Sequence, residues 1–183
     1  MGEEIFDYVR NKNINGIITY INQVNICNEF GETPLHVCLE ATDVDIDVLE
    51  LLLMNGAEIN SVTNNEKYTP LFYYCLYSTN YNMDVFDMLV KYGANLNALD
   101  ESGCTPIIDF ISRKQSYNYI SFIKHMINKG CNPYICDIFK NNVAHHYLMC
   151  DSDPRMIDFL KNDLKIDFNQ ENIYGLTPTV FIH

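Results

Sequence analysis

Hydrophobic positions fall into two short clusters in each stretch of roughly 35 residues. Residues 31–67 show the pattern well, with apolar positions concentrated in 35–39 and 48–53. Thr33-Pro34 favours a helix start before the first cluster, because Thr caps helices and Pro lacks the N–H that the first turn leaves unbonded. Asn55-Gly56 favours a helix end after the second cluster. The pattern predicts two short helices followed by an extended arm.

Two motifs recur with one shared period. A glycine follows the second helix at positions 56, 93 and 130, in steps of 37 residues. The other motif is Thr-Pro, which occurs at Thr33-Pro34, Thr69-Pro70, Thr105-Pro106 and Thr177-Pro178. The first two steps are 36 residues and the last is 72, a double step with Asn142-Val143 near its middle. One helix pair cannot bury its apolar faces alone, so such a period predicts a solenoid of stacked repeats.

The second helix of each repeat follows a connector. We expect these helices to begin at Asp47 in the first repeat and to span Asp84–Lys91, Ser121–Asn128 and Pro154–Lys161 in the next three. Glu3–Arg10 and Asn13–Asn22 form an expected helix pair that no Thr-Pro precedes, as in a terminal cap.

The expected organisation is a single domain over residues 1–183. It has an N-terminal helical cap at 1–27, repeats at 28–63, 64–99 and 100–136, a degenerate repeat at 137–171, and the start of a truncated fifth repeat at 172–183. A last helix beginning at Thr177 would expose Val180, Phe181 and Ile182. We therefore expect further repeats, or another subunit, to cover this end.

The segment 93–106 and the motif Thr33-Pro34-Leu35-His36 resemble the ankyrin-repeat pattern. The resemblance covers essentially the whole chain and implies an all-α ankyrin-repeat solenoid of stacked helix-turn-helix units with protruding β-turn arms. The repeats depart from the family pattern in length, because extra residues lie between the two helices in 40–47, 77–84 and 112–121. Larger residues also replace the alanines that usually follow the motif.

Irregular repeats, expanded connectors and a composition rich in Asn, Ile and Tyr are similar to those of the poxvirus ankyrin proteins. That resemblance implies a host-range or immune-evasion adaptor in the host cytoplasm or nucleus. Its partner would be a host antiviral or signalling protein: a nuclear factor kappa B regulator, an interferon effector or a cell-death kinase. Members often deliver partners to a Skp-Cullin ubiquitin ligase through a C-terminal F-box-like segment, which these residues lack. The alternative is a scaffold or effector of an AT-rich bacterium or protist, with a structural or self-assembly role.

The composition indicates the cellular compartment and disfavours some classes of binding partner. The seven cysteines are scattered, and no Asn-x-Ser/Thr glycosylation site occurs, which favours the cytosol or nucleus. A formal net charge of -12 disfavours nucleic acid and anionic membrane as partners. The abundance of Asn, Ile and Tyr is interpreted as a genome-composition signature without chemical meaning.

The sequence predicts no catalytic residues, no cofactor and no metal site. His36 and His145 occupy the motif's histidine position, where we expect them to tie neighbouring loops together by hydrogen bonds. The rival hypothesis is a metal-dependent enzyme that uses His145, His146 and either Cys150 or Asp151, although adjacent histidines diverge on a helix. Cys131 and Cys136 are too isolated to form a zinc site, which needs four close ligands. We expect Cys38 and Cys75 to be small core residues. We expect Asp43, Asp45 and Asp47 to form a solvated connector and not an acid/base pair.

The arm tips and the ends of the first helices are the expected protein-binding face. Large apolar residues recur there, and exposed aromatic side chains are typical interface anchors. The predicted anchors are Phe30, Tyr68, Tyr77, Ile138, Phe139, Ile173 and Tyr174. The alternative for each is that it packs on the neighbouring arm, or that its exposure has no function.

Overall fold

The computed structural model describes residues 4–113 and 116–181. Every regular element within these ranges is helical, and no β-strand occurs in them. The chain divides into two compact units, Met1–Asn95 and Leu96–His183, called here the first and the second unit. Each helix of the described ranges is too short or too polar to cross a lipid bilayer.

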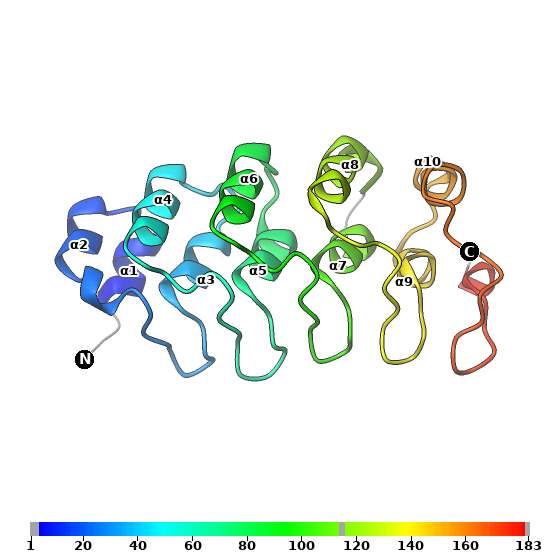
Figure 1. Ribbon diagram of the computed structural model, residues 1–183, viewed down its shortest axis with the longest axis horizontal. Helices are drawn as coiled ribbons and strands as arrows, with labels where there is room; N and C mark the ends of the chain where they lie inside the picture. Colours follow the sequence, from blue (N-terminus) through cyan, green and yellow to red (C-terminus); the bar gives the residue numbers. More distant parts are fainter. Residues whose placement is uncertain (1–3, 114–115, 182–183) are drawn as a thin grey trace. The chain divides into compact units, whose positions relative to one another are not determined.

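In its described residues, the first unit contains three helix pairs, which Figure 1 shows side by side. They are α1 (Glu4–Arg10) with α2 (Ile14–Thr19) and the 3-10 turn η1 (Ile21–Gln23), α3 (Pro34–Leu39) with α4 (Ile46–Met54), and α5 (Pro70–Tyr77) with α6 (Met83–Lys91). The first helices pack in sequence, α1 on α3 and α3 on α5. Each pair therefore covers the apolar face of the next, as the repeat pattern predicts.

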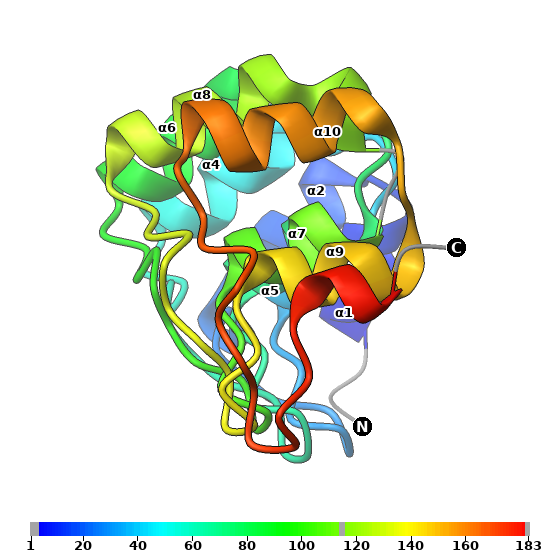
Figure 2. The same ribbon diagram turned by 90° about the vertical axis from the view of Figure 1, so that its right-hand side faces the viewer.

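The second unit repeats this arrangement. It contains α7 (Pro106–Arg113), the 3-10 turn η2 (Ser116–Tyr119), α8 (Ile120–Lys129), α9 (Val143–Cys150), α10 (Pro154–Asp158) with a π-helical turn η3 (Phe159–Asp163), and the 3-10 turn η4 (Pro178–Phe181). α7 packs on α9, and α9 packs on η4. Within each unit the first and second helices form two layers, with the arms extending from one end of them (Figure 2).

Three second helices, α4, α6 and α8, begin one residue earlier than the sequence predicted, and α10 begins at Pro154 as predicted. α4 begins at Ile46 because the carboxylate of Asp45 accepts bonds from the N–H groups of Asp47 and Val48. Asp45, a partly exposed residue of the connector, is thus the helix cap in place of Asp47. α6 likewise begins at Met83 behind an Asn82 cap. The predicted last helix also differs, because α10 ends at Asp158 and continues as a π-helical turn.

Large residues in the first helices hold the expanded connectors. The buried Tyr74 of α5 donates its hydroxyl to the carbonyl of Asn82 at 2.9 Å and accepts the Asn82 N–H at 2.7 Å. The buried Tyr147 of α9 accepts the Asp153 N–H at 3.0 Å. All three bonds involve the residue immediately before a second helix. The bulky residues therefore compensate for the long connectors by tying them to the core.

Asparagine side chains join successive repeats at the base of the arms. In the first unit Asn25 donates to the carbonyl of Gly56 at 2.8 Å, and Asn60 donates to that of Gly93 at 3.0 Å. In the second unit Asn97 donates to the carbonyl of Gly130 at 3.0 Å. Each of these carbonyls ends a second helix, where no intrahelical donor remains. The interpretation of asparagine as a signature without chemical meaning is wrong at these positions.

The last turn, η4, contains two of the three residues that the sequence predicts to be exposed at this end of the chain. Val180 is exposed, whereas Phe181 is half-buried, with its ring centroid 6.5 Å from that of His145. Ile182 lies outside the described residues.

Candidate functional site

Six of the seven predicted anchors are exposed, as expected. They are Phe30, Tyr77, Ile138, Phe139, Ile173 and Tyr174. Exposure ranges from 38 % for Phe139 to 67 % for Tyr174, so each retains surface that a partner could cover. Their role in binding stays a prediction.

The prediction that Tyr68 is exposed is wrong. Its ring stacks on Phe72 of α5 with centroids 5.0 Å apart, and the residue is only partly accessible. Its backbone is fixed as well, since its N–H donates to the Thr63 hydroxyl and its carbonyl contacts His36. Tyr68 therefore packs on the helix that follows its own arm, and not on the neighbouring arm as the alternative had it.

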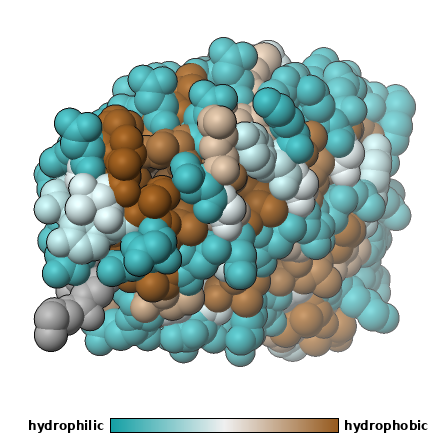
Figure 3. Space-filling model, turned by 60° about the vertical axis from the view of Figure 1, so that its left-hand side comes forward, coloured by the Kyte–Doolittle hydropathy of each residue, from teal (hydrophilic) through white to brown (hydrophobic). Residues whose placement is uncertain are grey.

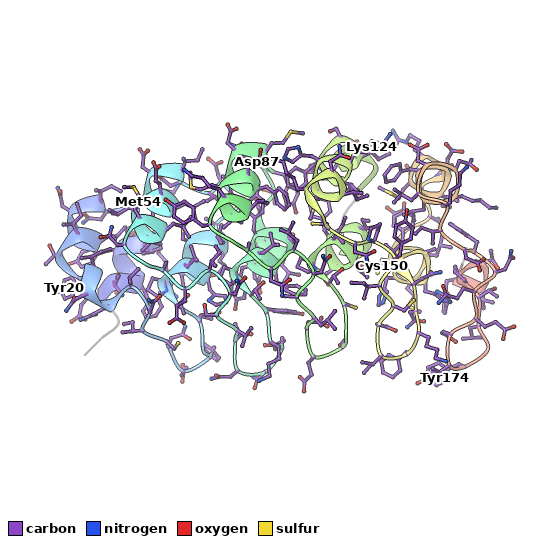
Figure 4. The ribbon with its side chains drawn as sticks, viewed as in Figure 1. Tyr20, Met54, Asp87, Lys124, Cys150 and Tyr174 are labelled. Atoms are coloured by element: carbon purple, nitrogen blue, oxygen red, sulfur yellow. The ribbon has the colours of Figure 1, made fainter. Side chains whose placement is uncertain are left out.

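Four of the exposed anchors form one cluster in the second unit. This tip patch consists of Ile138 and Phe139 on the fourth arm (131–142) and Ile173 and Tyr174 on the fifth arm (166–177). The Ile173 N–H donates to the carbonyl of Phe139 at 2.9 Å, and the Phe139 and Tyr174 rings stack with centroids 6.2 Å apart. The ring of Tyr174 lies at the end of its arm (Figure 4). The two arms thus present adjacent apolar side chains.

Buried polar residues hold the two tips rigidly. The Asp137 carboxylate accepts the N–H groups of Phe139 and Asn141 at 2.9 and 2.7 Å. The Asn172 side chain accepts those of Tyr174 and Leu176 at 2.9 and 3.1 Å in the same way. Since both tips are fixed before binding, little conformational entropy is lost when a partner covers the patch.

The two exposed anchors of the first unit lie on different elements. Phe30 is at the tip of the first arm (24–33), and its carbonyl accepts the Asn64 N–H of the second arm at 2.9 Å. Tyr77 ends α5, where its ring lies 5.2 Å from that of Tyr73. Figure 3 shows further hydrophobic side chains reaching the surface between hydrophilic ones.

A shallow hollow of about 300 Å³ also opens in the first unit. Its apolar lining comes from α1, α3 and α4, and Arg10, Lys12, Glu40 and Asp45 supply charge. The hollow includes Glu40, one of the helix-end positions that the sequence assigns to the binding face.

The two motif histidines tie neighbouring loops together, which confirms the expectation. His36 Nε2 lies 3.1 Å from the carbonyl of Tyr68, and His145 Nε2 lies 3.0 Å from that of Leu176. Burial lowers the pKa of both imidazoles below the usual 6.5. Neutral histidine suits this structural role, because each ring also accepts a backbone N–H at Nδ1.

The rival metal site does not form. His145 is buried and directs its Nε2 to Leu176, whereas His146 faces Asp137. Cys150 is exposed at the end of α9 (Figure 4). Cys38 and Cys75 are buried core residues, as expected. The seven cysteines, all within the described ranges, form no disulfide there.

A different group of potential ligands meets in the second unit, and sequence reasoning missed it. Cys104 Sγ lies 3.6 Å from His146 Nε2, and Asp137 Oδ2 lies 3.1 Å from the same nitrogen. The three ligand atoms are all within 4.8 Å of one another. The repeat register offered a signal, because Cys104 precedes its Thr-Pro directly and His146 follows the motif histidine of the next repeat.

Comparison with known proteins identifies one family. A family model described as Ankyrin repeats (3 copies) matches residues 5–100. No curated protein matches the chain.

Proposed function

Because this chain belongs to the ankyrin-repeat family, whose repeats form protein-interaction modules, we propose that its tip patch is the main contact for a protein partner. The family is generally a non-catalytic binding scaffold, and the proposed activity is binding alone. The observation that carries the proposal is the meeting of four exposed apolar side chains on two neighbouring, rigid arm tips.

The physical argument rests on the cost of exposing this surface. Single exposed apolar residues are common, but adjacent ones on rigid tips form a patch that water solvates poorly. Aromatic side chains such as Phe139 and Tyr174 bury large areas while losing few rotatable bonds, so they are effective interface anchors. A partner that covers them gains this hydrophobic contribution without having to order the tips first.

The charge of the chain indicates the kind of partner. With 24 acidic and 12 basic residues, the protein attracts positively charged surfaces. Complementary charge speeds encounter, whereas the buried apolar contacts slow dissociation. We therefore propose a partner whose binding surface has an apolar centre and a basic rim.

For the biological setting, we propose a viral host-range or immune-evasion adaptor that acts in the host cytoplasm. What supports this finer proposal is the resemblance to poxvirus ankyrin proteins in the expanded connectors and the Asn/Ile/Tyr-rich composition. The partner would be an antiviral or signalling protein of the host. Delivery to a Skp-Cullin ubiquitin ligase would need a further segment in the full-length protein.

Affinity capture from host-cell extracts, followed by mass spectrometry, tests the setting. We expect an antiviral or signalling protein to be enriched by the wild-type chain and lost when Phe139, Ile173 and Tyr174 are changed to Ala. Enrichment of the chain itself as the sole partner would favour the self-assembling scaffold and contradict the adaptor.

A further inference from the structure

We propose that Cys104, Asp137 and His146 bind a Zn²⁺ ion that clips together the third arm (96–105), the fourth arm and α9. All three residues lie in the second unit, on elements of two successive repeats. The proposal concerns a metal site within the solenoid and does not depend on the binding role of the tip patch.

The distances agree with a zinc site. Typical Zn–S, Zn–N and Zn–O bonds of about 2.3, 2.05 and 2.1 Å in a tetrahedron place S and N about 3.6 Å apart and N and O about 3.4 Å apart. The observed separations are 3.6 Å from Cys104 Sγ to His146 Nε2 and 3.1 Å from that nitrogen to Asp137 Oδ2. The same geometry places S and O about 3.6 Å apart, and Cys104 Sγ lies within 4.8 Å of the Asp137 carboxylate. Two of the three separations therefore need shifts of a few tenths of an ångström, and the third needs at most about 1 Å.

The arrangement points to a metal and away from a catalytic relay. In a Cys–His–Asp relay the imidazole uses its two nitrogens, one for the thiol and one for the carboxylate. Here both partners approach the same nitrogen, Nε2 of His146. The three ligand atoms lie within 4.8 Å of one another, which is close enough for them to share one cation.

Buried amides orient the carboxylate ligand. Asn141 donates its side-chain amide to Asp137 Oδ2 at 2.9 Å, and Asn172 in turn donates to the Asn141 side-chain oxygen at 2.8 Å. Partners of this kind fix a ligand's direction and are typical of metal sites. The Cys104 N–H is held as well, by the Asp100 carboxylate at 2.8 Å.

The donor set selects the metal. Thiolate and imidazole favour Zn²⁺ over Mg²⁺ or Ca²⁺, which prefer oxygen ligands. Zn²⁺ also neutralises one thiolate and one carboxylate, a favourable balance because Cys104 and Asp137 are each only 7 % exposed. The Cys104 thiol loses its proton to the solvent on binding. The partly exposed His146 side leaves access for water as the fourth ligand.

Cobalt titration of the reduced, metal-free chain tests the site. We expect one Co²⁺ per chain, with a thiolate-to-cobalt charge-transfer band and the intense visible bands of tetrahedral cobalt, all abolished by one equivalent of Zn²⁺. Cys104→Ala should remove the charge-transfer band. His146→Gln and Asp137→Asn should each weaken Zn²⁺ binding more than about tenfold, measured against a chromophoric chelator.

Cys150→Ala is the matched control, because this exposed cysteine ends the same helix as His146. It should keep the band and the affinity. His146→Gln, at a partly exposed position, keeps the test decisive if Cys104→Ala does not fold. The proposal is wrong if the wild-type chain shows no thiolate band at millimolar Co²⁺, or if a band of full intensity persists in folded Cys104→Ala or His146→Gln.

Discussion

His36 Nε2 contacts the backbone carbonyl of Tyr68, which lies 32 residues further along the chain, at 3.1 Å. The other ring nitrogen accepts the N–H of Thr33 at 3.1 Å. Nδ1 is thus unprotonated, and Nε2–H is the donor to Tyr68. One neutral imidazole therefore caps its own helix and joins it to the next arm.

This arrangement predicts that mild acid destabilises the protein. Burial lowers the pKa of His36 in the folded state, and the same holds for His145. Below about pH 6.5 the unfolded chain binds protons that the folded chain rejects. The histidine contribution to stability is therefore fully present above pH 6.5 and is lost as the pH falls toward the folded-state values.

Urea unfolding followed by circular dichroism between pH 7.5 and 5.5 measures this effect. We expect the free energy of unfolding to decrease as the pH is lowered, and to decrease less steeply in His36→Gln than in the wild type. An equal slope in both proteins would show that His36 does not contribute to the pH dependence.

The asparagine bridges predict a specific loss of stability. Asn97 donates to Gly130 and accepts the Asn132 N–H at 2.7 Å, so Asn97→Ala removes two hydrogen bonds between repeats. We expect a cost of about 1–2 kcal/mol in the free energy of unfolding. Asn128→Ala, on the exposed side of α8, is the control and should change it by less than about 0.5 kcal/mol. Equal effects of the two changes would contradict a bridging role.

The hydrogen bonds of Asn142 predict that replacing it by the threonine of the repeat motif lowers the stability of the protein. Its side-chain oxygen accepts the N–H groups of Ala144 and His145, and its amide donates to the carbonyl of Asp167 at 2.8 Å. Asn142→Thr keeps a cap but has no amide for Asp167. We expect a loss of about 1 kcal/mol in chemical unfolding. A gain in stability would mean that the motif threonine is the better residue in this repeat.

The sequence predicted the repeat architecture because that information is local. Thr33-Pro34 and Gly56 act on their own helix ends, and Gly56 adopts the left-handed φ of 82° that a helix end favours. Tyr68 was misjudged because its exposure depends on a ring from α5. Asp45 was misjudged because the choice between neighbouring acidic caps depends on how far the connector extends.

The repeat register places Cys104 and His146 in successive repeats, but spacing alone does not predict that their side chains meet or that asparagines bridge the repeats. Asn97 bonds a carbonyl 33 residues away, and Cys104 meets His146 across 42 residues. Such pairs arise only when one repeat stacks on the next in a definite register. A repeat period indicates that stacking occurs, but side-chain contacts across the interface depend on the rotation of each repeat.

The central claim is that the tip patch binds the protein partner. The sharpest measurement compares two triple variants by calorimetric titration with the captured partner. One variant changes Phe139, Ile173 and Tyr174 to Ala. The other changes Ile18, Met54 and Met83 to Ala. These are exposed apolar residues on the second helices α2, α4 and α6, so no arm tip is affected.

Both variants must first match the wild-type circular dichroism spectrum, so that a loss of binding reports the surface and not the fold. We predict that the tip variant binds at least about 100-fold more weakly, since each aromatic anchor typically accounts for tenfold or more. The control variant should stay within about threefold of the wild type. Undiminished affinity in the folded tip variant would contradict the proposed surface.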